Sequence, residues 1–141
     1  TTQGILEIMN KTEEYMKEIS GMDRFSFQSG GGSQAIMTMA SLVRAYHDKN
    51  GDSDIKDEII TTIYSHPSDA AAPALKGYKI IKIFPDENGY PDYEAFKEAV
   101  SERTAAFIVA NPEDTWVFNT FLDFGLGKEF MTKQMQMDYL E

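Results

Sequence analysis

Apolar side chains recur every three or four positions over the first twenty residues. This spacing places them on one face of a helix over residues 2–20, and most of the charged side chains fall on the opposite face. Gly21 is a typical stop signal, because glycine adopts the left-handed backbone that ends many helices. The positions on the apolar face are Ile5, Ile8, Met9, Thr12, Tyr15, Met16 and Ile19.

Beyond Gly21 the pattern alternates between strands and helices. Residues 59–63 are all β-branched, which is typical of a buried strand. Asp92 is placed to cap a helix, because its carboxylate can accept hydrogen bonds from the amides of the first turn. The predicted strands are residues 25–28, 58–64, 78–84 and 105–110, and the predicted helices are residues 34–47, 68–76 and 93–100. This alternation predicts an α/β fold with a mostly parallel sheet and flanking helices.

The charge and composition exclude several classes of function. With 13 basic and 23 acidic residues the net charge is −10, which argues against a nucleic-acid partner. The absence of cysteine excludes disulfides, thiolate metal sites and cysteine nucleophiles. No apolar run reaches the roughly 20 residues that cross a bilayer, and no signal peptide precedes Thr1. We therefore expect no membrane association and a cytoplasmic location.

A glycine-rich loop, residues 29–33 (SGGGS), lies between the first predicted strand and the helix that follows it. Glycine amides at the start of a helix can hold a phosphate without help from lysine. The glycine spacing matches neither the Walker loop nor the dinucleotide fingerprint, and no Lys or Arg adjoins the loop in the sequence. On glycine content alone, a flexible connector explains the loop equally well.

A second loop, residues 64–69 (YSHPSD), follows the β-branched strand. A histidine at the end of a strand, here His66, can stack on a planar ring or exchange protons. Ser68 is a candidate cap for the next helix, and Asp69 falls in that helix's first turn. Taken alone, His66 is explained more simply by a structural role.

A third loop, residues 111–115 (NPEDT), follows the last predicted strand. Asn111 can donate its amide to a phenolate-like oxygen, while Glu113 and Asp114 can bind a metal or act in acid–base chemistry. A polar turn explains the same residues, and His47 is explained as a cation near the C-terminal end of a helix. Because binding sites in parallel sheets lie at the carboxyl ends of the strands, we expect the three loops to converge.

Several stretches resemble the decarboxylating glycine dehydrogenase, the P-protein of the glycine cleavage system, in its second, lysine-bearing subunit or half. The resemblance covers residues 2–119 almost without gaps, and its combination of motifs is specific although each motif alone is not. The matching stretches are residues 3–8 (QGILEI), 18–23 (EISGMD), 26–32 (SFQSGGG), 44–47 (RAYH), 65–68 (SHPS), 85–92 (PDENGYPD), 99–104 (AVSERT) and 111–115 (NPEDT).

The resemblance implies the large domain of the aspartate-aminotransferase type (fold type I) of pyridoxal 5′-phosphate (PLP) enzymes. By position, it implies that Gly31, Gly32 and Ser33 wrap the cofactor phosphate and that His66 stacks on the pyridine ring. Ser68 stands where the family has a threonine or serine near the cofactor, and Asn111 would lie near the ring oxygen. The implied reaction is decarboxylation of glycine with transfer of an aminomethyl group to the lipoyl arm of the H-protein. The implied partners also include another P-protein subunit, since the family works as a dimer of active units.

The resemblance also has departures. Trp116 stands where the family usually has glycine, and the family's imine-forming lysine is not recognisable in residues 120–141. We expect Lys128 and Lys133, in that segment, to be surface residues. The expected organisation is therefore a partial large domain over residues 1–119 and a divergent, helical tail over residues 120–141. We expect no catalytic residue in this chain and no borohydride-trappable imine with PLP.

Two other functions remain open from the sequence. The first is a non-catalytic assembly module that uses the same fold element and self-associates through its apolar tail. The second is a phosphate or nucleotide binder that uses only the glycine loop.

Overall fold

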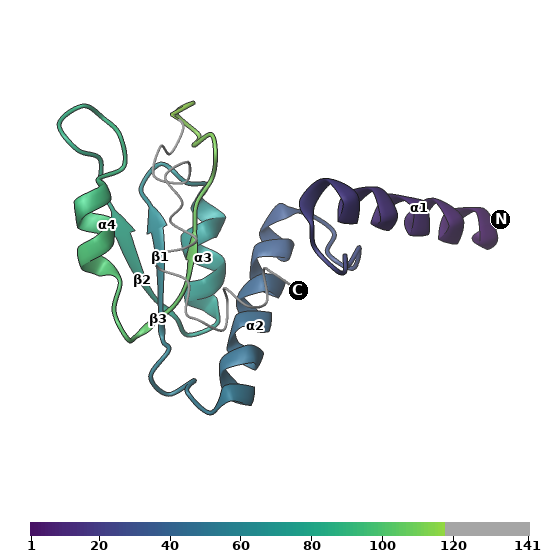
Figure 1. Cartoon of the computed structure of the whole chain (residues 1–141), viewed down its shortest axis with the longest axis horizontal. Helices are drawn as coiled ribbons and strands as arrows, with labels where there is room; N and C mark the ends of the chain where they lie inside the picture. The colour runs from purple at the N-terminus through teal and green to yellow at the C-terminus, as the bar shows by residue number, and fades with distance from the viewer. Residues whose placement is uncertain (118–141) are drawn as a thin grey trace.

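The computed structural model describes residues 1–117, which form four helices and three strands within that range. Figure 1 shows them in chain order, with the first helix extending away from the rest. The helices are α1 (Thr2–Ser20), α2 (Gly32–Asn50), α3 (Pro67–Leu75) and α4 (Tyr93–Ala99), and the strands are β1 (Glu58–Thr62), β2 (Lys79–Ile83) and β3 (Thr104–Ile108). The expected tail, residues 120–141, lies outside the described residues.

The three strands form one parallel sheet in the order β2-β1-β3. The central strand β1 is buried along its whole length, because it has a neighbour on each edge and helices on both faces. The prediction of an α/β fold with a parallel sheet and flanking helices is confirmed. None of the helices in residues 1–117 combines the length and apolar character needed to cross a bilayer.

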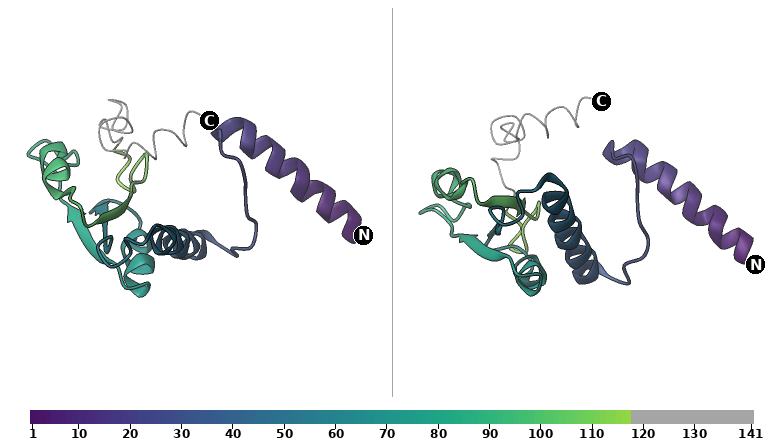
Figure 2. Two further views of the ribbon diagram at one scale, coloured as in Figure 1. Left: turned by 60° about the horizontal axis from the view of Figure 1, so that its bottom comes forward. Right: turned by 90° about the horizontal axis from the view of Figure 1, so that it is seen from below.

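The core consists of two clusters, one on each face of the sheet. Side chains alternate between faces along a strand, so the neighbours Ile59 and Ile60 of β1 enter different clusters. Ile60 packs with Phe96 of α4, whereas Ile59 packs with Ala40 of α2. Figure 2 shows α4 on one side of the strands and α2 with α3 on the other.

The predicted strand at residues 25–28 is wrong. These residues belong to an irregular connection between α1 and α2, and no β-ladder partner is assigned to them in the described part of the chain. Their amides bond to side chains instead. Phe25 N–H donates to Glu13 Oε1 (3.4 Å) and Gln28 N–H donates to Ser26 Oγ (3.4 Å). A strand needs a neighbour for its backbone groups, and short apolar alternation cannot supply one.

The predicted helix signals hold at two positions, Gly21 and Asp92. Gly21 adopts the left-handed conformation just beyond α1 (φ 73°), and Gly51 does the same beyond α2 (φ 77°). Asp92 caps α4 by accepting from Ala95 N–H at 3.0 Å. His47 lies in the last turn of α2 as expected, but its ring is buried and linked to Asp52 Oδ1 (2.9 Å) and to the Ala105 carbonyl (3.3 Å). The side chain of His47 therefore links α2 to β3. The sequence pattern does not indicate this contact.

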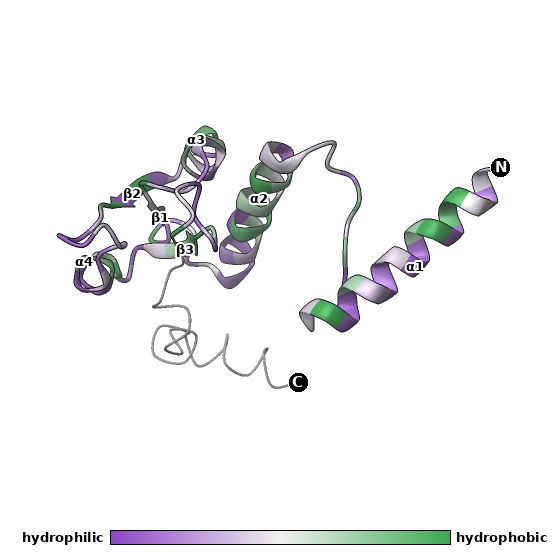
Figure 3. Ribbon diagram, turned by 90° about the horizontal axis from the view of Figure 1, so that it is seen from above, coloured by the Kyte–Doolittle hydropathy of each residue, from purple (hydrophilic) through white to green (hydrophobic). Residues whose placement is uncertain are grey.

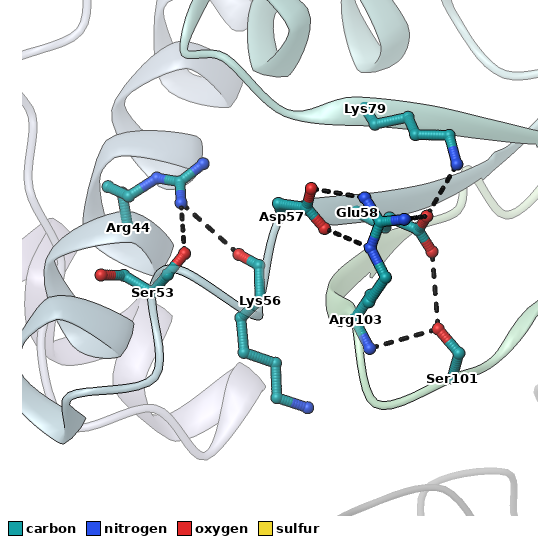
Figure 4. Close-up of polar contacts among 8 residues, drawn as sticks. All are labelled: Arg44, Ser53, Lys56, Asp57, Glu58, Lys79, Ser101 and Arg103. Atoms are coloured by element: carbon teal, nitrogen blue, oxygen red, sulfur yellow. Dashed lines mark hydrogen bonds and ion pairs between the residues drawn. The ribbon is translucent and has the colours of Figure 1, made fainter.

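Ion pairs gather where the strands begin, at the amino edge of the sheet (Figure 4). The buried carboxylate of Glu58 contacts Lys79 Nζ (2.9 Å) and an Arg103 Nη (3.4 Å). The guanidinium of Arg103 also donates to both carboxylate oxygens of Asp57. This two-point contact lowers the pKa of Asp57 below its ordinary value. The cluster thus joins the starts of β1, β2 and β3.

Candidate functional site

The loops that follow β1 and β3 lie against one another at the carboxyl edge of the sheet. The Asp114 amide donates to the Tyr64 carbonyl at 3.1 Å, and the Ala110 amide lies 3.4 Å from Ser65 Oγ. The hydroxyl of Thr62, the last residue of β1, donates to the buried carboxylate of Glu113 at 2.6 Å. Since β1 and β3 are neighbours in the sheet, their terminal loops converge as expected.

His66 stands at the start of α3, immediately beyond β1, with its ring exposed. Its Nδ1 accepts from Ser68 N–H (3.1 Å) and lies 2.7 Å from Ser68 Oγ. The prediction that Ser68 caps this helix is wrong, because His66 is the capping residue and Ser68 lies inside the first turn. With Nδ1 accepting, the proton of the neutral ring sits on Nε2. Ser68 thereby fixes the orientation of the ring, and the Nε2–H group is left to donate.

Asp69 faces the same pair of loops from the first turn of α3, as predicted, and it is buried. Burial raises the pKa of Asp69, and the hydrogen bond from Ser65 acts in the opposite direction. The neighbouring charges of Asp114 and Glu113 add smaller contributions that also raise this pKa. A negative charge on Asp69 is therefore costly, mainly because the side chain is buried.

This raised pKa leads to a prediction about stability. A carboxyl group with a raised folded-state pKa binds protons more tightly in the folded chain, so its contribution is most favourable at acidic pH and is lost as the pH rises through the folded pKa. Asp69→Asn should therefore be more stable than wild type at pH 7, with a smaller difference at pH 4. Urea unfolding at both pH values measures this difference.

The exposed Asp54 provides a control for the loss of one formal charge. Asp54→Asn should stay within about 0.5 kcal/mol of wild type in the free energy of unfolding at pH 7. A destabilised Asp69→Asn at pH 7 would show that the carboxylate is favourable in the fold.

Asn111 follows β3 and is exposed at the same edge, next to the buried Glu113. The chain from Glu113 to Val117 is held by the bonds from Glu113 N–H to the Val117 carbonyl (2.8 Å) and from Trp116 N–H to the Glu113 carbonyl (2.8 Å). Trp116 adopts a positive φ of 64° and is 83 % exposed. The third loop is thus an ordered turn that presents both an amide and an indole to solvent.

The prediction that the glycine loop lies between a strand and a helix is wrong, because the residues before it do not form a strand. The loop opens α2, with Gly31 as the N-terminal capping residue and no side chain capping the helix. Gln34 reaches back to accept from Gly30 N–H at 2.7 Å, and Ser29 Oγ lies 3.3 Å from Thr38 Oγ1. These bonds stay within the loop and α2. The structure therefore brings His66, Ser68 and Asn111 to one edge, whereas no bond described for the glycine loop joins it to them.

Lys76 is a residue that sequence reasoning missed. It lines a shallow cavity of about 320 Å³ beside the glycine loop, although no basic residue adjoins that loop in the sequence. Only the packing of α3 against α2 brings it there, so the sequence holds no signal for it. The other lining residues are Gln28, Ser29, Gln34, Met37, Thr38 and Ser41.

The loop has the chemistry that a phosphate requires. A Cβ atom placed on Gly31 or Gly32 would meet no atom within 4 Å, so space is open beside these two residues. These glycines form the start of α2, where the helix dipole is positive, and no side chain caps the helix there. These residues fit a phosphate group. Within residues 1–117 no three His, Asp or Glu side chains are grouped as metal ligands.

Most of the chain can be aligned with known proteins. No family model matches it. It is 41 % identical over 118 residues to a probable glycine dehydrogenase (decarboxylating) subunit 2 of Thermococcus gammatolerans, which covers 84 % of this chain and 23 % of the relative. A protein with the same description from Nitrosomonas eutropha is 38 % identical over 118 residues, which cover 84 % of this chain and 24 % of the relative. Another from Staphylococcus saprophyticus is 34 % identical over 116 residues, which cover 82 % of this chain and 23 % of the relative. The chain thus spans about a quarter of the length of these curated relatives.

Proposed function

Because this chain is homologous to a part of glycine dehydrogenase (decarboxylating) subunit 2, we propose that it provides the phosphate-binding and ring-binding loops of a PLP site in a glycine-decarboxylating enzyme. The observation that carries the proposal is the meeting of the loops after β1 and β3, with His66 and Asn111 exposed at one edge of a parallel sheet. Binding sites of such sheets lie at this edge.

Each candidate residue has a distinct role in this proposal. Gly31, Gly32 and Ser33 hold the phosphate by their backbone amides, because the helix start is uncapped and open. His66 offers its ring face to the pyridine, and Ser68 fixes the orientation of that ring. Asn111 would donate its amide to the ring oxygen. The chemistry that PLP supplies when bound is an electron sink for decarboxylation.

The whole enzyme's substrate and partners follow as part of the proposal. Glycine would be the substrate, and the lipoylated H-protein would receive the aminomethyl group. A further P-protein subunit would complete the assembly.

The proposal can be tested by measuring how pyridoxamine 5′-phosphate binds to the 141-residue chain. This ligand has the ring and phosphate of PLP but cannot form an imine with surface lysines. Trp116, the only tryptophan, lies in the loop beside Asn111 and reports binding through its fluorescence. We expect Gly31→Val to weaken binding by about tenfold or more, since a charge-assisted phosphate contact is worth roughly 1.5–3 kcal/mol. His66→Ala should weaken binding by about three- to tenfold, since a ring contact is worth roughly 0.5–1.5 kcal/mol.

The controls separate this function from simple phosphate binding. Gly31 is extended (φ 178°), so valine suits its backbone, and Gly4→Val in α1 also adds a side chain in open space. Gly4→Val should bind like wild type. If His66→Ala binds like wild type while Gly31→Val and Lys76→Ala both weaken binding, the chain is a phosphate binder and the ring site is refuted.

The alternative function, a non-catalytic assembly module, is favoured by a different observation. No residue of α1 is buried, although the helix carries several large apolar side chains. The tail that was expected to make the contact lies outside the described residues, so the evidence for assembly rests on α1.

A further inference from the structure

The helix α1 presents a line of exposed apolar side chains. Ile5 is 61 % exposed, Ile8 67 %, Tyr15 66 % and Ile19 79 %. Figure 3 shows hydrophobic bands repeating along α1, which lies clear of the sheet and of α2. A continuous exposed apolar surface of this kind marks an interaction site in a water-soluble protein.

The spacing of this line matches a coiled-coil seam. Ile5, Ile8, Thr12, Tyr15 and Ile19 are separated by three, four, three and four residues, and Met22 continues the pattern. Apolar residues that alternate in this way occupy the a and d positions of a heptad, which face a single partner helix. Met9 and Met16 widen this seam on one flank, at e positions, and are 38 % and 37 % exposed, while Leu6 at a b position is 53 % exposed. Residues at a and d positions fit one partner helix of the same kind.

The flanks of the seam indicate which helix it is. Lys11 and Glu18 are both exposed at g positions of this heptad, and g positions face each other in an antiparallel pair. If two copies of α1 run in opposite directions with Thr12 facing Tyr15, Lys11 of one copy faces Glu18 of the other, and this contact occurs twice. The opposite flank carries Met9 and Met16, and segment 25–28 lies beside Met9 there. The charges thus complement a second copy of this chain.

We propose that α1 pairs antiparallel with α1 of a second copy of this chain, along the seam from Ile5 to Ile19. Lys11 can exchange its present contact with Glu7 (3.1 Å) for the intermolecular one, because both side chains are about 60 % exposed. This pairing does not depend on cofactor binding, so it can fail or hold independently of the proposed PLP site.

Sedimentation velocity on the 141-residue chain tests the seam. Wild type should show a concentration-dependent dimer, and Ile8→Lys should be monomeric over the same range. Asn10→Lys adds the same charge on the opposite face of α1 and should dimerise like wild type, with circular dichroism checking the helix content of each variant. A wild-type monomer at every concentration, or a dimer that Ile8→Lys leaves intact, would refute the proposal.

A charge exchange tests the direction of pairing. Lys11→Glu puts two like-charged contacts into its own dimer, and so does Glu18→Lys, so each variant alone should dimerise about tenfold more weakly than wild type at low salt. An equimolar mixture of the two variants restores both opposite-charge contacts and should recover the wild-type affinity. If the mixture is no tighter than the single variants, the antiparallel arrangement is wrong.

Discussion

Phe96→Ala is expected to lower the free energy of unfolding by about 3–5 kcal/mol, the usual cost of removing a buried aromatic side chain. Phe96 is only 2 % exposed and joins α4 to Ile60 of β1 and Ile83 of β2. Its ring also meets Phe107 of β3 edge to face, with centroids 5.7 Å apart. One side chain thus contacts all three strands, and a small domain has only about 5–15 kcal/mol of stability in total.

The matched control is Phe107→Ala. This side chain has the same size and takes part in the same ring contact, but it is 41 % exposed. Its loss should cost roughly 1–2 kcal/mol, since about half of the apolar transfer energy is involved. Urea unfolding followed by far-UV circular dichroism compares the two variants. Equal losses of unfolding free energy in the two variants would contradict the burial of Phe96 between α4 and the sheet.

The second large effect is expected at His47. His47→Leu keeps a side chain of similar size but removes the contacts to Asp52 and to the Ala105 carbonyl. We expect a loss of about 2–3 kcal/mol, because two hydrogen bonds disappear and a carbonyl next to a buried side chain loses its partner. The Asp52 carboxylate is 36 % exposed and can be hydrated, which limits the cost.

His66 is the matched control, since the chain contains only these two histidines. Its ring is exposed and its Nδ1 caps α3, so His66→Leu should lower the free energy of unfolding by about 1 kcal/mol, the usual cost of losing an N-cap side chain. Thermal unfolding of the two variants in parallel distinguishes a structural histidine from a surface one. A His47→Leu variant with the melting temperature of the His66→Leu variant would contradict the link between α2 and β3.

The sequence pattern predicts the α/β architecture because its signals are local. The β-branched run that becomes β1, the cap at Asp92 and the stop at Gly21 each depend on residues within a few positions of one another. The strand at residues 25–28 fails because a strand also needs a neighbour, which no local pattern contains.

The candidate site was predictable where it depends on strand ends and unpredictable where it depends on packing. His66 and Asn111 could be placed at one edge because their strands are parallel neighbours. The position of Lys76 beside the glycine loop and the contact of His47 with β3 both depend on residues far apart in the chain. No local sequence pattern predicts either of them. Because serine is a common cap, the sequence predicts Ser68 as the cap of α3, whereas His66 performs that function with its ring nitrogen.

The ion pairs of Glu58, Arg103 and Asp57 lie where the strands begin, at the edge opposite His66 and Asn111. Substitutions that strengthen or weaken this charged cluster change how firmly the three strands are held without touching the loops of the candidate site. Heat tolerance and ligand preference can therefore evolve independently in this fold, and a laboratory selection for one should collect its mutations at a different edge from a selection for the other.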